Sequence, residues 1–196
     1  MGMGKGRLEA FSDGVMAIII TIMVLELKVP HSPSLDALWA LWPVGLSYLL
    51  SFVYVGIYWN NHHHLLHAAR QVDGKVLWAN LHLLFWLSLL PFATGWLGEN
   101  HFAAVPCAFY GLVLLACAIA YWVLQGLVLA QEPQDSPLRQ ALGQDWKGKG
   151  SIVAYALGMA VTPWSVVVPL ALYVGVALMW LVPDRRIERH LGSARH

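Results

Sequence analysis

The chain has 196 residues, of which 58% are hydrophobic and only 12% are charged, and its formal net charge is +1 at pH 7. Because ordinary globular domains carry about 25% charged residues, this composition excludes a soluble globular protein and indicates an integral membrane protein. Ten tryptophans, seven tyrosines and six phenylalanines fit aromatic belts at the two membrane interfaces.

Apolar segments long enough to cross a bilayer as helices, about 20 residues each, recur along the whole chain. The last apolar stretch would measure about 48 Å as one helix, whereas the hydrocarbon core is roughly 30 Å thick. Pro163 is expected to break this stretch in two. The prediction is an all-α integral membrane protein, a single domain over residues 1–196 with six transmembrane helices. The predicted spans are about 8–29, 35–64, 76–97, 102–130, 150–162 and 164–182.

Two further prolines do not change the predicted count of six spans. Pro43 and Pro91 lie inside predicted spans and are expected to kink them rather than end them.

With six spans, eleven of the twelve Lys and Arg residues fall on one side of the membrane, and Lys28 alone falls on the other. This asymmetry predicts that both termini are cytoplasmic.

Charged and polar residues stand at the start of the first span, where Arg7 is followed by Phe11, Ser12, Asp13 and Gly14. Charge inside a bilayer costs about 2.5 kcal/mol or more, so an ionisable residue there indicates a functional site. A second interpretation stays open, in which Ser12 or Asp13 caps a helix that begins at Gly14 and Arg7 reaches the lipid headgroups.

The first span also carries an aliphatic stripe. At 100° per residue, Ile22 and Leu25 lie within about 40° of Ile18, and Thr21 borders them. Asp13 lies about 140° from Ile18, so this helix offers two different interfaces. Ordinary helix packing is the alternative explanation of the stripe.

Histidines end the second span, in the run His62, His63, His64 and His67. His63 and His67 have the spacing of two metal ligands on a helix, but no third ligand is evident, so we expect no dedicated metal site. We interpret the run as a polar girdle at the depth of Asn80 in the third span. A proton-coupled or metal-ion transporter that uses this cluster is the alternative function. No nucleophile or cofactor signature appears, so we expect no enzyme.

These residues carry a resemblance to a known family. Arg7 and the Phe11–Gly14 motif, the apolar helix that follows, the tryptophan and histidine run of the second span, and Trp78, Asn80 and Leu81 leading to SLLPF resemble the transmembrane protein 175 family. The resemblance implies a potassium-permeable cation channel in the bacterial inner membrane, a homotetramer whose first helices line a central pore. Its expected partners are the lipid bilayer and permeant monovalent cations such as K⁺. No cofactor and no nucleic acid are expected.

The resemblance also implies roles for single residues. Ile18 would form the constriction, continued by Ile22 and Leu25, with Thr21 as the polar position beside it. Selectivity for K⁺ over Na⁺ would be modest and would follow from the easier dehydration of K⁺, and protons are a further candidate permeant ion. Hydrogen bonds from the pore helix to the next two helices would hold it, with these candidate residues: Arg7, Ser12, Asp13, His62, His63, His64 and Asn80. Glu26 would raise the cation concentration at the outer mouth, or would be a solvated helix end.

Overall fold

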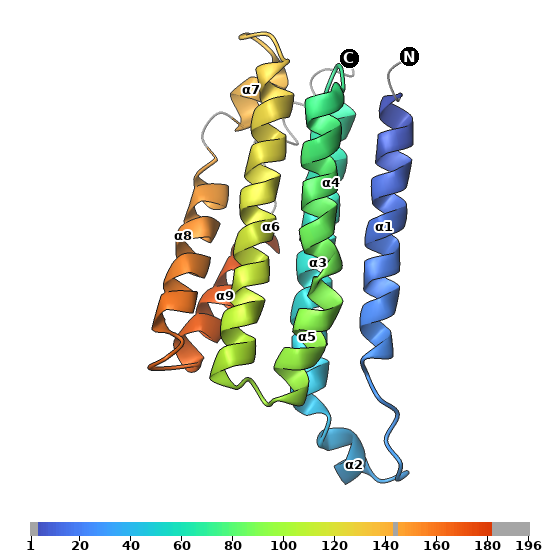
Figure 1. Ribbon diagram of the computed structural model, residues 1–196, viewed down its shortest axis with the longest axis vertical. Helices are drawn as coiled ribbons and strands as arrows, with labels where there is room; N and C mark the ends of the chain where they lie inside the picture. Colours follow the sequence, from blue (N-terminus) through green and yellow to red (C-terminus); the bar gives the residue numbers. More distant parts are fainter. Residues whose placement is uncertain (1–3, 143–144, 182–196) are drawn as a thin grey trace.

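A computed structural model describes residues 4–142 and 145–181, and all the regular structure in these ranges is helical (Figure 1). The elements are α1 (Lys5–Leu25), α2 (Leu35–Trp39), α3 (Trp42–Ala68), α4 (Gly74–Ser88), α5 (Leu90–Glu99), α6 (Ala104–Ala130), α7 (Pro137–Leu142), α8 (Trp146–Val161) and α9 (Val167–Leu181). The four arginines near the end of this sequence, which contribute to the predicted topology, lie in 182–196, outside the described residues.

Four helical segments of the described chain are long and apolar enough to cross a membrane: α1, α3, α4 together with α5, and α6. The remaining pair, α8 with 16 residues and α9 with 15, pack against each other. Each is shorter than the roughly 20 residues that a perpendicular span requires. The all-helical membrane architecture is therefore confirmed, whereas the count of six spans stays a prediction.

Prolines begin helices in this fold. The second predicted span is divided into α2 and α3, and Pro43 occupies the first turn of α3. Pro91 occupies the first turn of α5, directly after the junction with α4 at Leu89. The expectation of a kink within a continuous helix was wrong at Pro43, whereas at Pro91 a one-residue interruption at Leu89 lies inside a single apolar segment from Gly74 to Glu99, as expected. The reason at Pro43 is that proline costs no hydrogen bond in the first helical turn, where its missing N–H would have no partner inside the helix.

The helix α1 lies at one edge of the bundle, and α8 and α9 lie at the other edge (Figure 1). It packs against α3, α4 and α5. Its buried side chains follow one another at three- or four-residue intervals and so form a single stripe. They are Leu8, Ser12, Met16, Ile19 and Met23. The other face of α1 is not covered by any other helix of residues 4–142 and 145–181.

Buried hydroxyl groups tie the middle of the bundle together. Thr94 Oγ1 lies 2.6 Å from Ser51 Oγ, which in turn pairs with the Tyr110 hydroxyl at 2.9 Å. The Tyr54 hydroxyl donates to the Tyr173 carbonyl oxygen at 2.6 Å. These bonds join α3 to α5, α6 and α9, and they satisfy polar groups that would be costly to bury alone.

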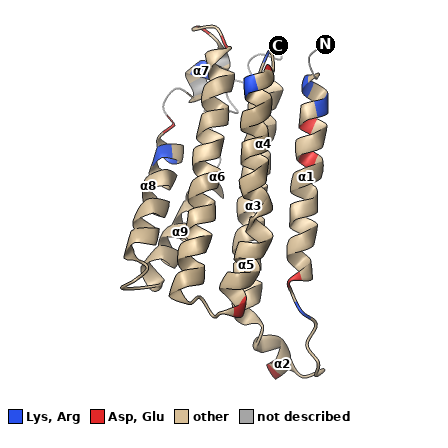
Figure 2. Cartoon of the chain, viewed as in Figure 1, with Lys and Arg blue, Asp and Glu red and all other residues tan. Residues whose placement is uncertain are grey.

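Charges gather at the two ends of the bundle, and its middle carries none (Figure 2). One end, which we call the basic end, contains the starts of α1, α4 and α8 with Lys5, Lys75 and Lys147. The opposite end, the acidic end, contains Glu26 and Glu99 where α1 and α5 finish. At the basic end the Asp73 carboxylate caps α4 by accepting from the Val76 N–H (2.9 Å), and this hydrogen bond lowers the pKa of Asp73.

The close approach of α3 and α5 requires glycine at position 98. A Cβ added there would lie 2.6 Å from the Val44 Cα and 2.5 Å from the Ser47 Oγ. We therefore expect Gly98→Ala to lower the free energy of unfolding by about 1–3 kcal/mol, measured as a lower melting temperature in detergent. Gly126→Ala in α6 is the matched control, because nothing lies within 4 Å of its added Cβ. Equal melting of both variants and the wild type would contradict this helix approach.

Candidate functional site

The uncovered face of α1 is aliphatic. Ile18 is 57% exposed, Ile22 43% and Leu25 76%, and Thr21 lies exposed beside them. The Thr21 hydroxyl donates to the Ile18 carbonyl oxygen at 2.9 Å, so its own lone pairs remain available on the exposed side. The α1 helix therefore presents three large apolar side chains and one hydroxyl oxygen to its surroundings.

Three buried side chains anchor the opposite face of α1. Ser12 Oγ donates to the Leu8 carbonyl oxygen and accepts from Asn80 Nδ2, each at 2.9 Å. Asn80 Oδ1 lies 2.7 Å from His62 Nε2, and since an amide oxygen only accepts, the imidazole carries its proton on Nε2. All three side chains are at most 1% exposed. We call Ser12, Asn80 and His62 the anchor triad, and it joins α1, α4 and α3.

The other motif residues lie outside this triad. Asp13 Oδ1 accepts a hydrogen bond from Trp59 Nε1 at 3.0 Å. The Arg7 side chain is exposed and makes no hydrogen bond or ion pair with another described residue. Six residues along a helix correspond to about 9 Å and leave two side chains 120° apart, so Arg7 and Asp13 cannot pair within α1. Phe11 and Gly14 are exposed.

The histidines of the predicted girdle also separate. His62 is buried in the anchor triad, whereas His63, His64 and His67 are exposed on α3. The sequence left open which histidine faces inward, because adjacent helical positions differ by 100° and only the packing of α3 against α4 selects one of them. Trp59 was not predicted as the partner of Asp13. The available signal was the indole N–H of Trp59, because an indole near a membrane interface normally finds a hydrogen-bond acceptor.

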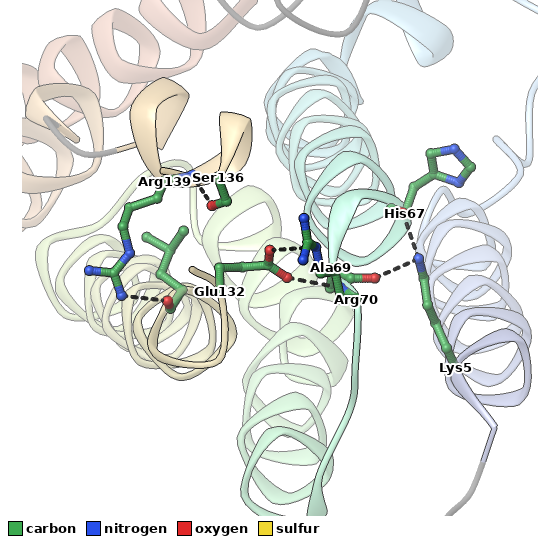
Figure 3. Close-up of polar contacts among 8 residues, drawn as sticks. Lys5, His67, Ala69, Arg70, Glu132, Ser136 and Arg139 are labelled. Carbon is green, nitrogen blue, oxygen red and sulfur yellow. Dashed lines mark hydrogen bonds and ion pairs between the residues drawn. The ribbon is translucent and has the colours of Figure 1, made fainter. Parts of the chain in front are cut away.

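Lysine and arginine side chains fix the basic end of α1 and α3, which the sequence did not predict (Figure 3). Lys5 Nζ donates to the carbonyl oxygens of His67 (2.5 Å) and Ala69 (2.9 Å). A cation is favourable here, because these carbonyls end a helix and carry partial negative charge. The Arg70 N–H donates to Glu132 Oε1 at 2.9 Å, and its Nε lies 3.7 Å from Oε2. These contacts fasten α3 to α1 and to the end of α6.

A groove of about 590 Å³ separates α1 from α5 towards the acidic end. Ile18, Ile22 and Phe92 are among its apolar lining residues, and Glu26 is among its polar ones. The Glu26 carboxylate lies against Gly95, where an added Cβ would stand 2.9 Å from Oε2. The absence of a side chain at Gly95 therefore makes room for this carboxylate.

A neighbouring ion pair removes two charges from the same end. Lys28 pairs with Glu99, and its hydrogen bond and charge interaction with that carboxylate raise the pKa of Lys28. Because Lys28 and Glu99 neutralise each other, Glu26 is left as the uncompensated carboxylate closest to the end of α1.

The potential metal-ligating side chains are dispersed among residues 4–142 and 145–181. No three His, Cys, Asp or Glu side chains of these residues lie close enough together to hold an ion. Cys107 and Cys117 are buried free thiols on α6.

Known proteins resemble this chain throughout its length. The family model of the endosomal/lysosomal potassium channel TMEM175 matches residues 7–91. A potassium channel of Chryseobacterium sp. (strain P1-3) is 53% identical over 189 residues, which are 96% of this chain and 98% of that protein. The mouse endosomal/lysosomal proton channel TMEM175 is 31% identical over 132 residues, 61% of this chain and 26% of that protein.

A solved structure shares the fold. It is the crystal structure of a lysosomal potassium-selective channel TMEM175 homolog from Chamaesiphon minutus, with a TM-score of 0.79 and 29% sequence identity. The superposition covers 91% of this chain and 96% of that chain. The likeness therefore extends well beyond the segment that the family model matches and includes the second half of the bundle.

Removing the Asn80 amide tests how much the anchor triad contributes to the stability of the fold. In Asn80→Ala, the buried Ser12 and His62 side chains lose their shared partner, and each unpaired buried group costs about 1–3 kcal/mol. We expect a lower melting temperature and a smaller folded peak in fluorescence-detected size-exclusion chromatography. Asn60→Ala is the control, because Asn60 is exposed on the same helix as His62. If the two variants melt alike, the triad does not hold α1.

Proposed function

Because this chain belongs to the TMEM175 channel family, we propose that it forms a potassium-permeable cation channel. The observation that carries the proposal is the exposed aliphatic face of α1, with Ile18, Ile22 and Leu25 uncovered in a helix whose other face is firmly anchored. The bacterial relative that shares 53% identity is named a potassium channel, which supports K⁺ as a permeant ion. The name of the mouse relative supports protons as a further one.

In the proposed assembly, four subunits of six spans each place their α1 helices around a central axis, and α8 and α9 supply the last two spans. The uncovered faces of α1 then meet across the axis. A ring of four Ile18 side chains is narrow and apolar and excludes water when closed, which makes it a gate that works by dewetting. Ile22 and Leu25 extend this apolar section towards the acidic end.

Selectivity in such a pore comes from dehydration. No ring of backbone carbonyls replaces the hydration shell, because the α1 carbonyls are used inside the helix. An ion must shed water to pass Ile18, and K⁺ does so more readily than Na⁺, so discrimination between them is modest. Thr21, whose hydroxyl oxygen has free lone pairs, offers a partial replacement for lost water next to the constriction.

The anchor triad fixes the orientation of the α1 side chains that form this gate. A pore helix that lines an axis on one side contacts its own subunit only on the other, so its rotation must be fixed there. Ser12, in the half of α1 that precedes Ile18, is held by Asn80, which is in turn held by His62. The triad therefore sets which α1 side chains point to the axis.

The two ends of the bundle define the proposed orientation. The basic end, with the starts of α1, α4 and α8, is placed in the cytoplasm of a bacterial cell, consistent with the preference of Lys and Arg for that side. The acidic end then forms the outer mouth. Four copies of Glu26 concentrate cations there, because clustered carboxylates attract them.

The constriction is tested by Ile18→Asn. The amide wets the apolar ring, so we expect faster K⁺ flux into liposomes and smaller reversal-potential differences between K⁺ and Na⁺ in planar bilayers. Ile119→Asn on α6 is the matched control, because Ile119 is likewise exposed but belongs to another helix. Wild-type flux and selectivity in Ile18→Asn would remove Ile18 from the constriction. Saturable, pH-driven uptake without voltage-driven K⁺ flux would favour a transporter that uses the histidines instead.

The outer mouth is tested by Glu26→Gln. Loss of four carboxylates lowers the local K⁺ concentration, so we expect a smaller single-channel conductance at low salt. The difference should vanish at high salt, since the Debye length falls from about 30 Å at 0.01 M to about 3 Å at 1 M. Asp36→Asn in α2 is the control for general surface charge. Equal losses in both variants would show that Glu26 has no special position at the mouth.

A further inference from the structure

Three aromatic rings stack along one face of α3 in the half nearer the basic end. The ring centroids of Trp59 and His63 lie 6.0 Å apart with 23° between the planes, and those of His63 and His67 lie 5.8 Å apart with 16° between the planes. All three side chains are exposed. We call Trp59, His63 and His67 the ring ladder, and nothing in the pore described above uses its imidazoles.

The two imidazoles of the ladder keep their nitrogens unused within the described part of the chain. Neither the His63 ring nor the His67 ring makes a hydrogen bond to another residue in residues 4–142 and 145–181. In contrast, the ring nitrogen of His62 is bound to Asn80, and that of His82 accepts from Trp86 Nε1 at 2.9 Å. Two neutral imidazoles with available nitrogens are the ligands that transition metals prefer.

The geometry of the ladder suits chelation. Residues four apart on a helix have Cβ atoms about 5–6 Å apart on one face, and the nearly parallel rings show that His63 and His67 point the same way. A metal ion binds imidazole nitrogen at about 2.0–2.1 Å, so modest rotations about the side-chain bonds bring one nitrogen of each ring to a shared ion. His64 adjoins this pair but meets His63 edge to face, with 64° between the planes.

One carboxylate and one ammonium lie close to the ladder. The Lys5 ammonium is held by the backbone carbonyls of His67 and Ala69, and the His67 ring points away from it (Figure 3). The Asp13 carboxylate accepts from Trp59, the first ring of the ladder. A carboxylate is thus placed beside the ladder, and the nearest ammonium is already engaged with its own acceptors.

Water must reach the ladder in the membrane. Imidazoles exposed on a spanning helix do not face lipid, because polar groups there face a water-filled space or another protein surface. The ladder flanks α1, since Trp59 bonds to Asp13 and the His67 carbonyl bonds to Lys5. It therefore lies beside the basic half of the helix that carries Ile18, where an aqueous entrance gives ions access.

We propose that His63 and His67 form a two-imidazole site for a divalent transition-metal ion of the Cu²⁺, Ni²⁺ or Zn²⁺ class. No third His, Cys, Asp or Glu ligand gathers with them among the described residues, so water completes the coordination. This site differs in chemistry from the K⁺ pathway, whose ligands are oxygens. It also revises the expectation from sequence that these histidines hold no metal, because spacing alone did not show that the rings are nearly parallel and exposed.

Copper binding tests the site without any flux measurement, so its outcome is independent of the channel proposal. The full-length chain, purified without an affinity tag, is titrated with Cu²⁺ in detergent and followed by electron paramagnetic resonance, in which bound imidazole nitrogens split the copper signal. The wild type is expected to show a two-nitrogen site, and His63→Asn and His67→Asn are each expected to lose it. His64→Asn, next to His63 on the same helix, is the matched control and is expected to keep it.

Size-exclusion profiles and melting temperatures establish that each variant is folded, and Ni²⁺ binding by calorimetry provides a second measurement on the same proteins. Loss of one Ni²⁺ per chain in His67→Asn, with no loss in His64→Asn, is expected. A two-nitrogen copper signal that survives in folded His63→Asn and His67→Asn would overturn the proposal, as would a wild type that binds neither metal. Equal loss in all three variants would also overturn it, because the pair would then have no special role.

Discussion

A polar group inside a membrane protein must find a partner within the protein, because the lipid offers none. In this chain the requirement is met by the anchor triad, where Ser12, Asn80 and His62 come from three different helices and bond in series. Each bond is directional, so the series fixes not only which helices touch but also how far each is rotated about its axis. An apolar stripe alone would tolerate small rotations of α1, since hydrophobic contact has no direction.

The rotation of α1 about its axis determines which of its side chains are buried and which are exposed. With Ser12 turned inward, Met16, Ile19 and Met23 are buried, while Ile18, Ile22 and Leu25 are exposed. The helix thus belongs to its own subunit on one side and is open on the other. Its ends are fixed separately, by Lys5 on the α3 carbonyls and by Glu26 in the space that Gly95 leaves. Because both ends of α1 and its rotation are fixed, its exposed side chains are held in defined positions.

The two ends of the bundle use charge differently. At the basic end, Lys5 donates to backbone carbonyls, and Glu132 accepts from the Arg70 backbone N–H and pairs with its guanidinium, so these charges serve to hold helices together (Figure 3). At the acidic end, Lys28 cancels Glu99 and leaves Glu26 without a compensating cation. Several charges at the basic end therefore hold helices together, whereas the Glu26 carboxylate stays available beside the exposed end of α1.

The sequence by itself determined the class of the protein. Its apolar segments predicted a helical membrane protein, and the resemblance carried by Arg7 and the Phe11–Gly14 motif identified a family that the relatives confirm. Helical periodicity also separated Asp13 from Ile18, because angles within one helix follow from residue spacing alone. Only the tertiary structure decided that His62 rather than His63 or His64 meets Asn80, that Asp13 bonds to Trp59 while Arg7 stays apart, and that Pro43 and Pro91 begin helices. These facts depend on how one helix is rotated against another, and that rotation is set by the summed packing of many side chains distant in sequence, which no local pattern contains.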